Sequence, residues 1–234
     1  MDVQALTHLT KARAGLILDH PFFGSLALRL RLVEDNDIPT LSVNGKVIKY
    51  NAEFVKELPL PLAKSALAHE VMHCVFDHMG RLGEREHKRW NHAGDYVIND
   101  ILKDAGFQLG DGWLHSPAFK GMSTDDVYNQ LPPDPPGDSQ DQLEPGDPDS
   151  AQKAADQREW QVAAAQAANA AALMGKLPGS LERFVSEMLK PKVDWREVLR
   201  RFVDQASRDD FNWRRLNRRA LAQDVYLPGL HSEH

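Results

Sequence analysis

The chain has 234 residues, of which 42% are hydrophobic and 26% charged, which is enough apolar material for one large domain or a compact domain with an appendage. The single cysteine, Cys74, excludes an internal disulfide and a multi-cysteine zinc site, and the net charge of -6 argues against a surface built throughout for nucleic acid. No apolar run reaches the roughly 18 to 20 residues of a membrane span, and the N-terminus lacks a secretory signal pattern. We therefore expect a cytoplasmic protein without a membrane segment.

Residues 1–50 are predicted to form one helix followed by a small sheet. Apolar residues recur at helical spacing over residues 3–18. In residues 25–33, four leucines alternate with other residues, as in a strand with one buried face. Residues 40–50 hold two alternating runs joined by Asn44-Gly45, a strong hairpin signal because both turn positions favour positive φ. These patterns predict a three-stranded antiparallel sheet.

Three helices are predicted after the sheet. A short one spans residues 52–58, and a strongly apolar one spans residues 62–79, with Gly80 and Gly83 as its stop. A third, over residues 88–105, turns apolar side chains toward a core.

The second half of the chain begins with an acidic, proline-rich segment, residues 132–150, which contains no Lys or Arg. Such a composition buries too little apolar surface to order itself, so we predict a flexible loop or linker, with a docking or autoinhibitory segment as the alternative. Helices are predicted over residues 151–174, 178–189 and 194–205, and residues 211–230 are predicted to be irregular or strand-like.

The most informative motif is His69-Glu70-Val71-Met72-His73, an HExxH pattern within the apolar helix. Residues four apart lie one helical turn from each other, so the imidazoles of His69 and His73 can reach one zinc ion. Glu70, beside the first ligand, is placed to act as general base and acid in metal-assisted peptide hydrolysis. The alternative is that both histidines are ordinary polar residues of a half-buried helix.

A catalytic zinc needs a third protein ligand, and the next helix offers one. His92, Asp95 and Asn99 share one face of that helix because they are spaced at i, i+3 and i+7. We predict Asp95 as the third ligand, with His92 as its rival or as a group near the substrate. Asn99 and Asp100 are candidates for orienting ligands or capping backbone.

His78 is the other nearby histidine, and we predict that it is not a ligand. On a continuous helix it lies about 140° from His73, off the metal-facing side. It is therefore interpreted as a solvent-facing or helix-terminal histidine.

The end of the chain is locally basic. Nucleic-acid binding could use these side chains on phosphates, but pairing with acidic residues is preferred, because the whole chain is acidic. The residues concerned are Arg196, Arg200, Arg201, Arg208, Arg214, Arg215, Arg218 and Arg219.

Three stretches of the sequence carry a family resemblance. They are residues 67–73, the Trp90-Asn91 to Asn99 stretch, and residues 213–219 with Tyr226-Leu227-Pro228. They resemble the metallopeptidase domain of the DUF2201 family, which is found N-terminal to VWA-like domains in bacterial and phage proteins. The resemblance spans most of the chain and implies a zincin-like fold. It further implies His69 and His73 as metal ligands, Glu70 as the catalytic carboxylate and Asp95 as third ligand.

Two features depart from the family pattern. Leu216 stands where the family is expected to have proline. The chain also ends at His234 without a VWA-like domain, so we expect a truncated or a stand-alone member.

Together these observations predict an α+β protein. Its zincin-like core, residues 1–131, combines a small antiparallel sheet with the HExxH helix and the ligand helix, followed by the acidic loop and a helical C-terminal region, residues 151–234. We expect a Zn²⁺-dependent metallopeptidase that binds a protein or peptide substrate, with an edge strand in residues 29–33 or 40–43 pairing with the peptide. The alternative is a non-proteolytic metal-containing module that docks a VWA protein or a MoxR-type AAA ATPase, as the family's gene company implies.

Overall fold

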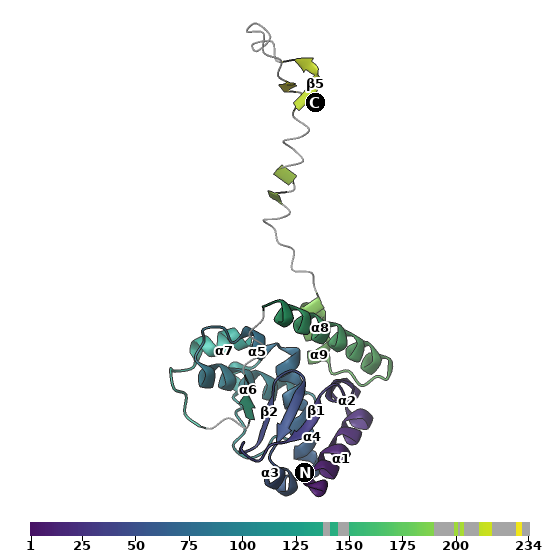
Figure 1. The fold of residues 1–234 in the computed structure, drawn as a ribbon, viewed down its shortest axis with the longest axis vertical. Coiled ribbons are helices and arrows are strands. Elements are labelled where there is room, and N and C mark those ends of the chain that lie inside the picture. Colours follow the sequence, from purple (N-terminus) through teal and green to yellow (C-terminus); the bar gives the residue numbers. More distant parts are fainter. Residues whose placement is uncertain are drawn as a thin grey trace. The chain divides into compact units, whose positions relative to one another are not determined.

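The computed structural model describes residues 1–137, 141–144, 150–189, 199–200, 202–203, 211–216 and 228–230. The chain divides into two compact units, Met1–Leu189 and Lys190–His234, both drawn in Figure 1. In the second unit, β5 (Phe211–Leu216) pairs antiparallel with β6 (Pro228–Leu230), as the strand-like pattern predicted. Of the helix predicted over residues 194–205, residues 199–200 and 202–203 are helical, and the remainder lies outside the described residues.

The first unit contains a four-stranded sheet with the strand order β1-β3-β2-β4. Its strands are β1 (Arg31–Glu34), β2 (Leu41–Val43), β3 (Val47–Tyr50) and β4 (Asp141–Leu143). The predicted hairpin is confirmed, because β2 and β3 are antiparallel and the backbone N–H groups of Lys46 and Val47 donate to Asn44 Oδ1 in the turn. Of the two turn residues expected to have positive φ, only Gly45 does, at 88°.

The sheet is mixed, so the predicted antiparallel sheet is wrong. β1 runs parallel to β3, and β2 runs parallel to β4. The chain leaves β1, crosses to β2 and returns along β3, which inserts between them. β1 and β2 run in opposite directions, so β3, which is antiparallel to β2, lies parallel to β1.

The strand predicted over residues 25–33 is right only for its last third: residues 25–27 belong to a helix, residues 28–30 form a turn, and residues 31–33 belong to β1. α1 (Val3–Asp19) confirms the first predicted helix, and α2 (Pro21–Ala27) follows it directly. Pro21 occupies the first helical position, where its fixed φ suits a helix and its missing N–H costs nothing. Leu26 is buried in helical register with the two phenylalanines of α2, so the leucine alternation crosses a helix, a turn and the start of β1.

The other helices agree with the sequence patterns except near residue 77. Those that match predictions are α3 (Ala52–Glu57), α6 (His87–Asp104), α8 (Ser150–Leu173) and α9 (Gly179–Leu189). The apolar helix, predicted to reach residue 79, is instead split into α4 (Leu60–Val75) and α5 (His78–Arg81). Asp77 separates the two in the left-handed conformation with φ 54°, which Asp tolerates better than most residues. The elements that the sequence did not predict include η1 (Pro117–Phe119) and α7 (Thr124–Gln130).

α4 is the central helix of the first unit. It contacts α1, α2, α6, α8 and β2, and every residue from Ala66 to Val75 is buried. In Figure 1, α1, α2 and α8 lie to one side of the sheet, and α5, α6 and α7 lie to the other. A helix buried on all sides belongs to the interior of a domain, so the polar residues of α4 are enclosed there.

The acidic segment contributes a strand to this sheet. β4 lies beside β2, and the side chain of Leu143 is buried in the core. Just after the strand, Glu144 accepts a hydrogen bond from Ser42 Oγ at 2.9 Å and pairs with Lys49 at 2.8 Å. Residues 138–140 and 145–149 lie outside the described residues, but the strand between them is packed on the sheet. β4 pairs with the outer side of β2, so β2, one of the two strands predicted as a peptide-binding edge, is not at the edge of the described sheet.

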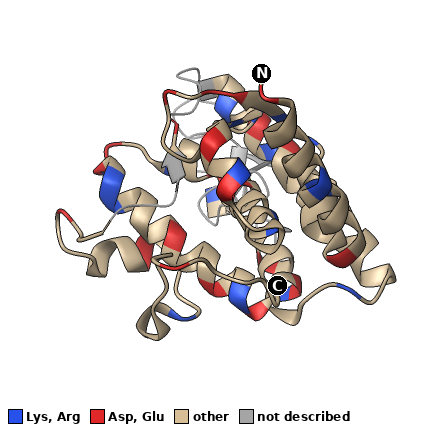
Figure 2. Ribbon diagram, turned by 90° about the horizontal axis from the view of Figure 1, so that it is seen from below, with Lys and Arg blue, Asp and Glu red and all other residues tan. Residues whose placement is uncertain are grey.

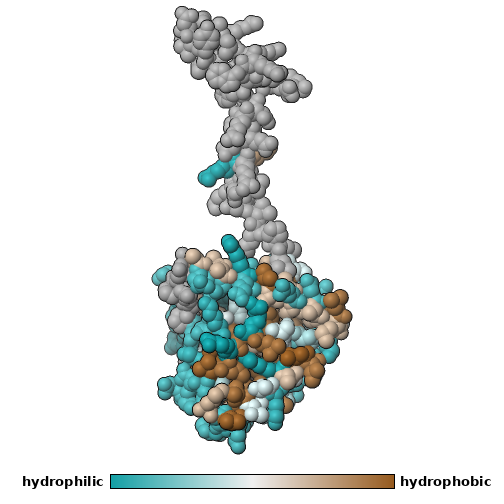
Figure 3. All heavy atoms as spheres, turned by 45° about the vertical axis from the view of Figure 1, so that its right-hand side comes forward, coloured by the Kyte–Doolittle hydropathy of each residue, from teal (hydrophilic) through white to brown (hydrophobic). Residues whose placement is uncertain are grey.

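The surface of the first unit is mixed in polarity. Figure 3 shows a face on which hydrophobic residues gather among hydrophilic ones. Large apolar side chains exposed on this unit include Leu18, Leu28 and Val162. Among the described residues, we find no helix with both the length and the apolar character needed to cross a membrane.

Candidate metal centre

The HExxH motif lies in the enclosed half of α4. His69 and His73 are one turn apart, and both imidazoles are at most 2% exposed. Their Nε2 atoms lie 3.0 Å from each other, so both rings turn the same nitrogen toward the same point. Glu70, between them in sequence, is also buried.

α6 brings a carboxylate to the same point. Its partly apolar face packs on α4, and its N-terminus is capped by the Glu86 side chain, which accepts from two backbone N–H groups. The fully buried Asp95 places Oδ1 3.3 Å from His69 Nε2 and 3.4 Å from His73 Nε2. Within the described residues, these three form the group of His, Cys, Asp and Glu side chains that could hold a metal ion.

The spacing of these three atoms suits a tetrahedral ion. Two ligands bound about 2.0 to 2.1 Å from zinc at a tetrahedral angle are about 3.3 Å apart. The observed sides of the triangle, 3.0, 3.3 and 3.4 Å, lie close to that value. The two nitrogens and one oxygen therefore form one face of a tetrahedron before any ion is added.

The Asp95 carboxyl is held in its charged form. Burial raises its pKa, but hydrogen bonds from His69 and His73, together with their charge interactions, outweigh burial and keep the pKa below its usual range. A carboxylate at this position is the state that a cation requires.

The second nitrogen of each histidine has a partner of its own. His69 Nδ1 is 3.0 Å from Asn99 Oδ1, and Asn99 Nδ2 donates to the Leu114 carbonyl at 2.9 Å. His73 Nδ1 is 3.0 Å from His78 Nδ1. Asn99, left by the sequence as a candidate for orienting ligands, lies where such a residue would be needed.

Of the two alternatives predicted for His78, the solvent-facing one is wrong because the side chain is buried, whereas the helix-terminal one is right because α5 begins at His78. His78 would face away from the metal ligands on a continuous helix, but the left-handed Asp77 ends α4 and redirects the chain into α5. His78 is thereby fully buried, with its ring stacked on Phe76. Burial lowers its pKa, and nearby His73 and Arg81 lower it further, which favours the neutral imidazole. His78 was also predicted not to be a metal ligand, and it is not one of the three residues that could hold an ion.

The remaining candidates lie near the group but outside it. His92 is buried on α6, one turn before Asp95, and is not among the three clustered residues. Asp100 lies with its carboxylate 3.7 Å from His115 Nε2 and accepts from the Gly121 N–H at 3.4 Å. Trp113, which no sequence pattern singled out, has its ring edge-on to that of His69, with 5.8 Å between the centroids.

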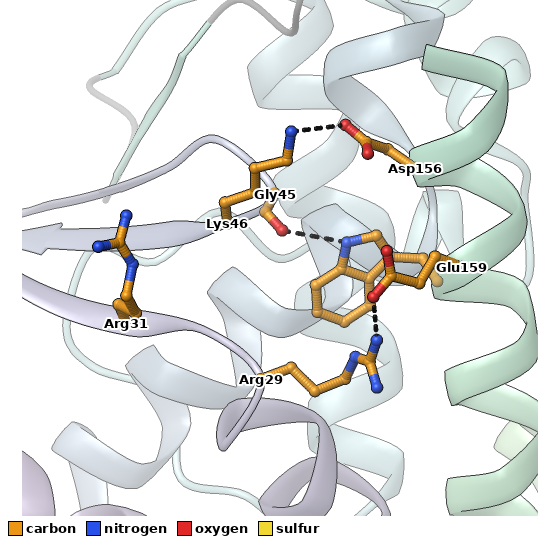
Figure 4. Close-up of a pocket in the computed structure, with 7 residues that line it drawn as sticks. Arg29, Arg31, Gly45, Lys46, Asp156 and Glu159 are labelled. Atoms are coloured by element: carbon orange, nitrogen blue, oxygen red, sulfur yellow. Dashed lines mark hydrogen bonds and ion pairs between the residues drawn. The ribbon is translucent and has the colours of Figure 1, made fainter. Parts of the chain in front are cut away.

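A separate pocket of about 440 Å³ lies where the hairpin turn meets α8. Figure 4 shows Lys46 paired with Asp156 and Arg29 paired with Glu159, while Arg31 lies apart from both pairs. Trp160 Nε1 donates to the Gly45 carbonyl at 3.1 Å between the two pairs. The two ion pairs and the Trp160 hydrogen bond join α8 to the hairpin, and none of the residues that line this pocket belongs to the possible metal-binding group.

Charge of one sign does not dominate the first unit. Figure 2 shows basic and acidic residues interspersed along its ribbon. Of the basic tail residues, Arg196, Arg201, Arg208, Arg218 and Arg219 lie outside the described residues. The preference for pairing over nucleic-acid binding therefore stays a prediction for that part of the chain.

Comparison with known sequences supports a metal-dependent role. The profile of the DUF2201_N family, described as a "putative metallopeptidase domain", matches residues 4–142 and 133–231. The chain belongs to the DUF2201_N family. The matched residues include α4 and α6, so the family description and the cluster of His69, His73 and Asp95 concern the same part of the molecule.

A relative from Thermotoga maritima resembles this DUF2201_N chain. That protein, named "Uncharacterized protein", is 32% identical over 135 residues, which cover 54% of this chain and 33% of the relative. The chain thus spans about a third of the relative's length. No solved structure matches the chain.

Proposed function

We propose that this chain is a zinc-dependent metallopeptidase with a zincin-like core. The observation that carries the proposal is the triangle of His69 Nε2, His73 Nε2 and Asp95 Oδ1, with sides of 3.0 to 3.4 Å. Two imidazoles and one carboxylate are a donor set typical of catalytic zinc, which keeps a further position open. The family description supports the same chemistry.

His69, His73 and Asp95 would hold the ion. Zn²⁺, when bound, supplies Lewis-acid polarisation of a carbonyl and lowers the pKa of a water molecule to about 7. The hydrogen bonds at both Nδ1 atoms then keep each Nε2 lone pair directed at the ion.

Glu70 is proposed as the catalytic carboxylate. Its side chain takes a proton from the attacking water and returns it to the amine of the departing peptide, as general base and then general acid. Its side chain is buried, which limits competing contact with bulk solvent.

The substrate is proposed to be an extended peptide. β4 covers the outer side of β2, so β2 is not available as an edge, whereas β1 pairs with β3 alone within the described sheet. Of the two edges predicted from sequence, the one at β1 is therefore the remaining candidate for strand addition.

A non-proteolytic metal-containing module is the alternative. The near-complete burial of all three ligand side chains favours it, because a structural site needs no position that water or substrate can reach. In that case, the partners would be a VWA protein or a MoxR-type AAA ATPase, and metal would stabilise the docking fold.

Glu70→Gln in the full chain separates these functions. We expect the variant to keep the zinc content of the wild type, measured by elemental analysis, and to cleave a peptide library about 10² to 10⁴ times more slowly. Glu57→Gln, an exposed change of the same chemistry, is the control and should cleave as the wild type does. Equal cleavage by Glu70→Gln and wild type would remove Glu70 from the mechanism, and bound zinc without cleavage in the wild type would favour the module.

A further inference from the structure

A row of three polar side chains runs away from the metal centre through the interior. His73 Nδ1 lies 3.0 Å from His78 Nδ1, and His78 Nε2 lies 3.0 Å from Thr124 Oγ1. The two imidazoles are fully buried and Thr124 is 2% exposed. The row therefore connects α4, α5 and α7 with no bulk water in contact.

The distances allow one consistent arrangement of protons when a metal occupies His73 Nε2. His73 Nδ1–H then donates to His78 Nδ1, and His78 Nε2–H donates to the Thr124 hydroxyl oxygen. A ligand histidine in metal sites almost always donates its other N–H to a fixed acceptor, which sets both its ring orientation and its basicity. Here that acceptor is a second histidine, itself held by a hydroxyl.

The surroundings of His78 fix its ring tightly. Phe76 stacks on it with 7° between the ring planes, and Trp90 meets it edge-on with 5.7 Å between centroids. Trp90 Nε1 also donates to the His78 carbonyl at 2.9 Å, which holds the start of α5 in place.

Gly94 leaves the space that the row needs. A Cβ atom at this position on α6 would lie 2.8 Å from His78 Nδ1 and 3.3 Å from His73 Cε1. Any larger residue there would push against the contact between the two imidazoles, one residue before Asp95. The missing side chain at Gly94 of α6 thus leaves room for the contact between His73 and His78.

We propose that His78 and Thr124 are positioning residues that fix the ring and the Nδ1 proton of His73 for metal binding. This inference rests on the proposed function only in assigning His73 as a ligand, and it does not require peptide cleavage. Neither residue contacts the ion or the substrate, so their effect passes through His73. On the sequence alone, His78 was interpreted as a solvent-facing or helix-terminal histidine, and Thr124 was given no role.

The test uses Zn²⁺ and Co²⁺ with the full chain. Thr124→Val keeps the shape of the side chain and removes the hydroxyl, Thr124→Ser restores it, and His78→Phe keeps a ring without an acceptor. Ser65→Ala is the matched control, because Ser65 is a buried residue of α4 whose hydroxyl donates to the Gln108 carbonyl at 2.6 Å, outside the row. Zn²⁺ affinity is measured by competition with a chelator, and ligand geometry by the visible spectrum of bound Co²⁺.

We expect Thr124→Val and His78→Phe each to weaken Zn²⁺ binding about 10- to 100-fold and to alter the Co²⁺ spectrum. Thr124→Ser should recover most of the affinity, and Ser65→Ala should bind as the wild type does even if it unfolds at a lower temperature. Wild-type affinity and spectrum in both folded variants would overturn the inference, as would a wild type that binds neither metal. A wild type that binds Zn²⁺ but cleaves no peptide would count against the proposed function alone, because the affinities still report on the row.

Discussion

Two regions of the first unit gather charged and polar side chains from distant parts of the chain, and they do so differently. At the candidate metal centre, α4 and α6 bring His69, His73 and Asp95 together, and Asp95 has no exposed surface. At the hairpin pocket, Arg29 pairs with Glu159 while their side chains remain 39% and 67% exposed. The first region is enclosed and its donor atoms face one point, whereas the second is open and its charges face each other.

The difference indicates which region is suited to hold a cation. Burying a carboxylate between two imidazoles is costly unless a cation or protons balance the charge. Exposed ion pairs need no ligand, and each contributes little to stability in water. The candidate site is therefore distinguished by donor atoms that are buried and face one point, whereas the exposed ion pairs of the hairpin pocket only link two elements.

The largest effect is expected from Asp95→Ala. Removing the only carboxylate of the cluster leaves two ligands, so Zn²⁺ binding should fall below detection by elemental analysis. In the wild type, free Zn²⁺ at 100 times its Kd should stabilise the fold by about 2.7 kcal/mol, and this gain should be absent in the variant. Thermal unfolding with Zn²⁺ and with a chelator measures both.

Asp104→Ala provides the control for that experiment, because Asp104 lies at the end of the same helix and pairs with the exposed Lys120. It should keep the metal-dependent rise in unfolding temperature. If Asp95→Ala kept that rise as well, the cluster would not be where the ion binds.

Much of the candidate site was predictable because it depends on local spacing. Two histidines four residues apart must share a helix face, and the i, i+3, i+7 pattern of the next helix limits the third ligand to a face that holds Asp95 and its rival His92. His78 was not predictable in the same way. Its burial depends on one left-handed residue, Asp77, and on packing against Trp90, neither of which changes the periodicity of the sequence.

A smaller effect is expected from Trp160→Phe in the hairpin pocket. The change removes the hydrogen bond to the Gly45 carbonyl but keeps an aromatic ring, so stability should fall by about 0.5 to 1.5 kcal/mol plus a packing loss. Urea unfolding measures the loss, and Val162→Ala on the exposed side of α8 should cost less than about 0.5 kcal/mol. Zn²⁺ affinity should stay unchanged, and a marked loss of affinity would show that the two regions are coupled.

The sheet was predicted less well than the helices, because its pairing is non-local. The Asn44-Gly45 turn fixes only the contact between β2 and β3. The insertion of β3 beside β1, and the arrival of β4 about a hundred residues later, depend on side-chain burial such as that of Leu143. Composition described the acidic segment correctly as poor in apolar residues, yet one leucine and a row of backbone hydrogen bonds suffice to dock its strand.

The smallest effect is expected at the Arg29–Glu159 ion pair. It tests whether the charges of the hairpin pocket are as exposed to water as the comparison with the candidate metal centre requires. Arg29→Gln, Glu159→Gln and the double variant form a cycle whose coupling energy should be below about 1 kcal/mol. The coupling should shrink further in 1 M salt, where the screening length is about 3 Å, because both side chains remain in water. Urea unfolding of the four proteins at low and high salt gives the value. A coupling of several kcal/mol that resists salt would mean that this pocket is closed in solution and that burial does not separate the two regions.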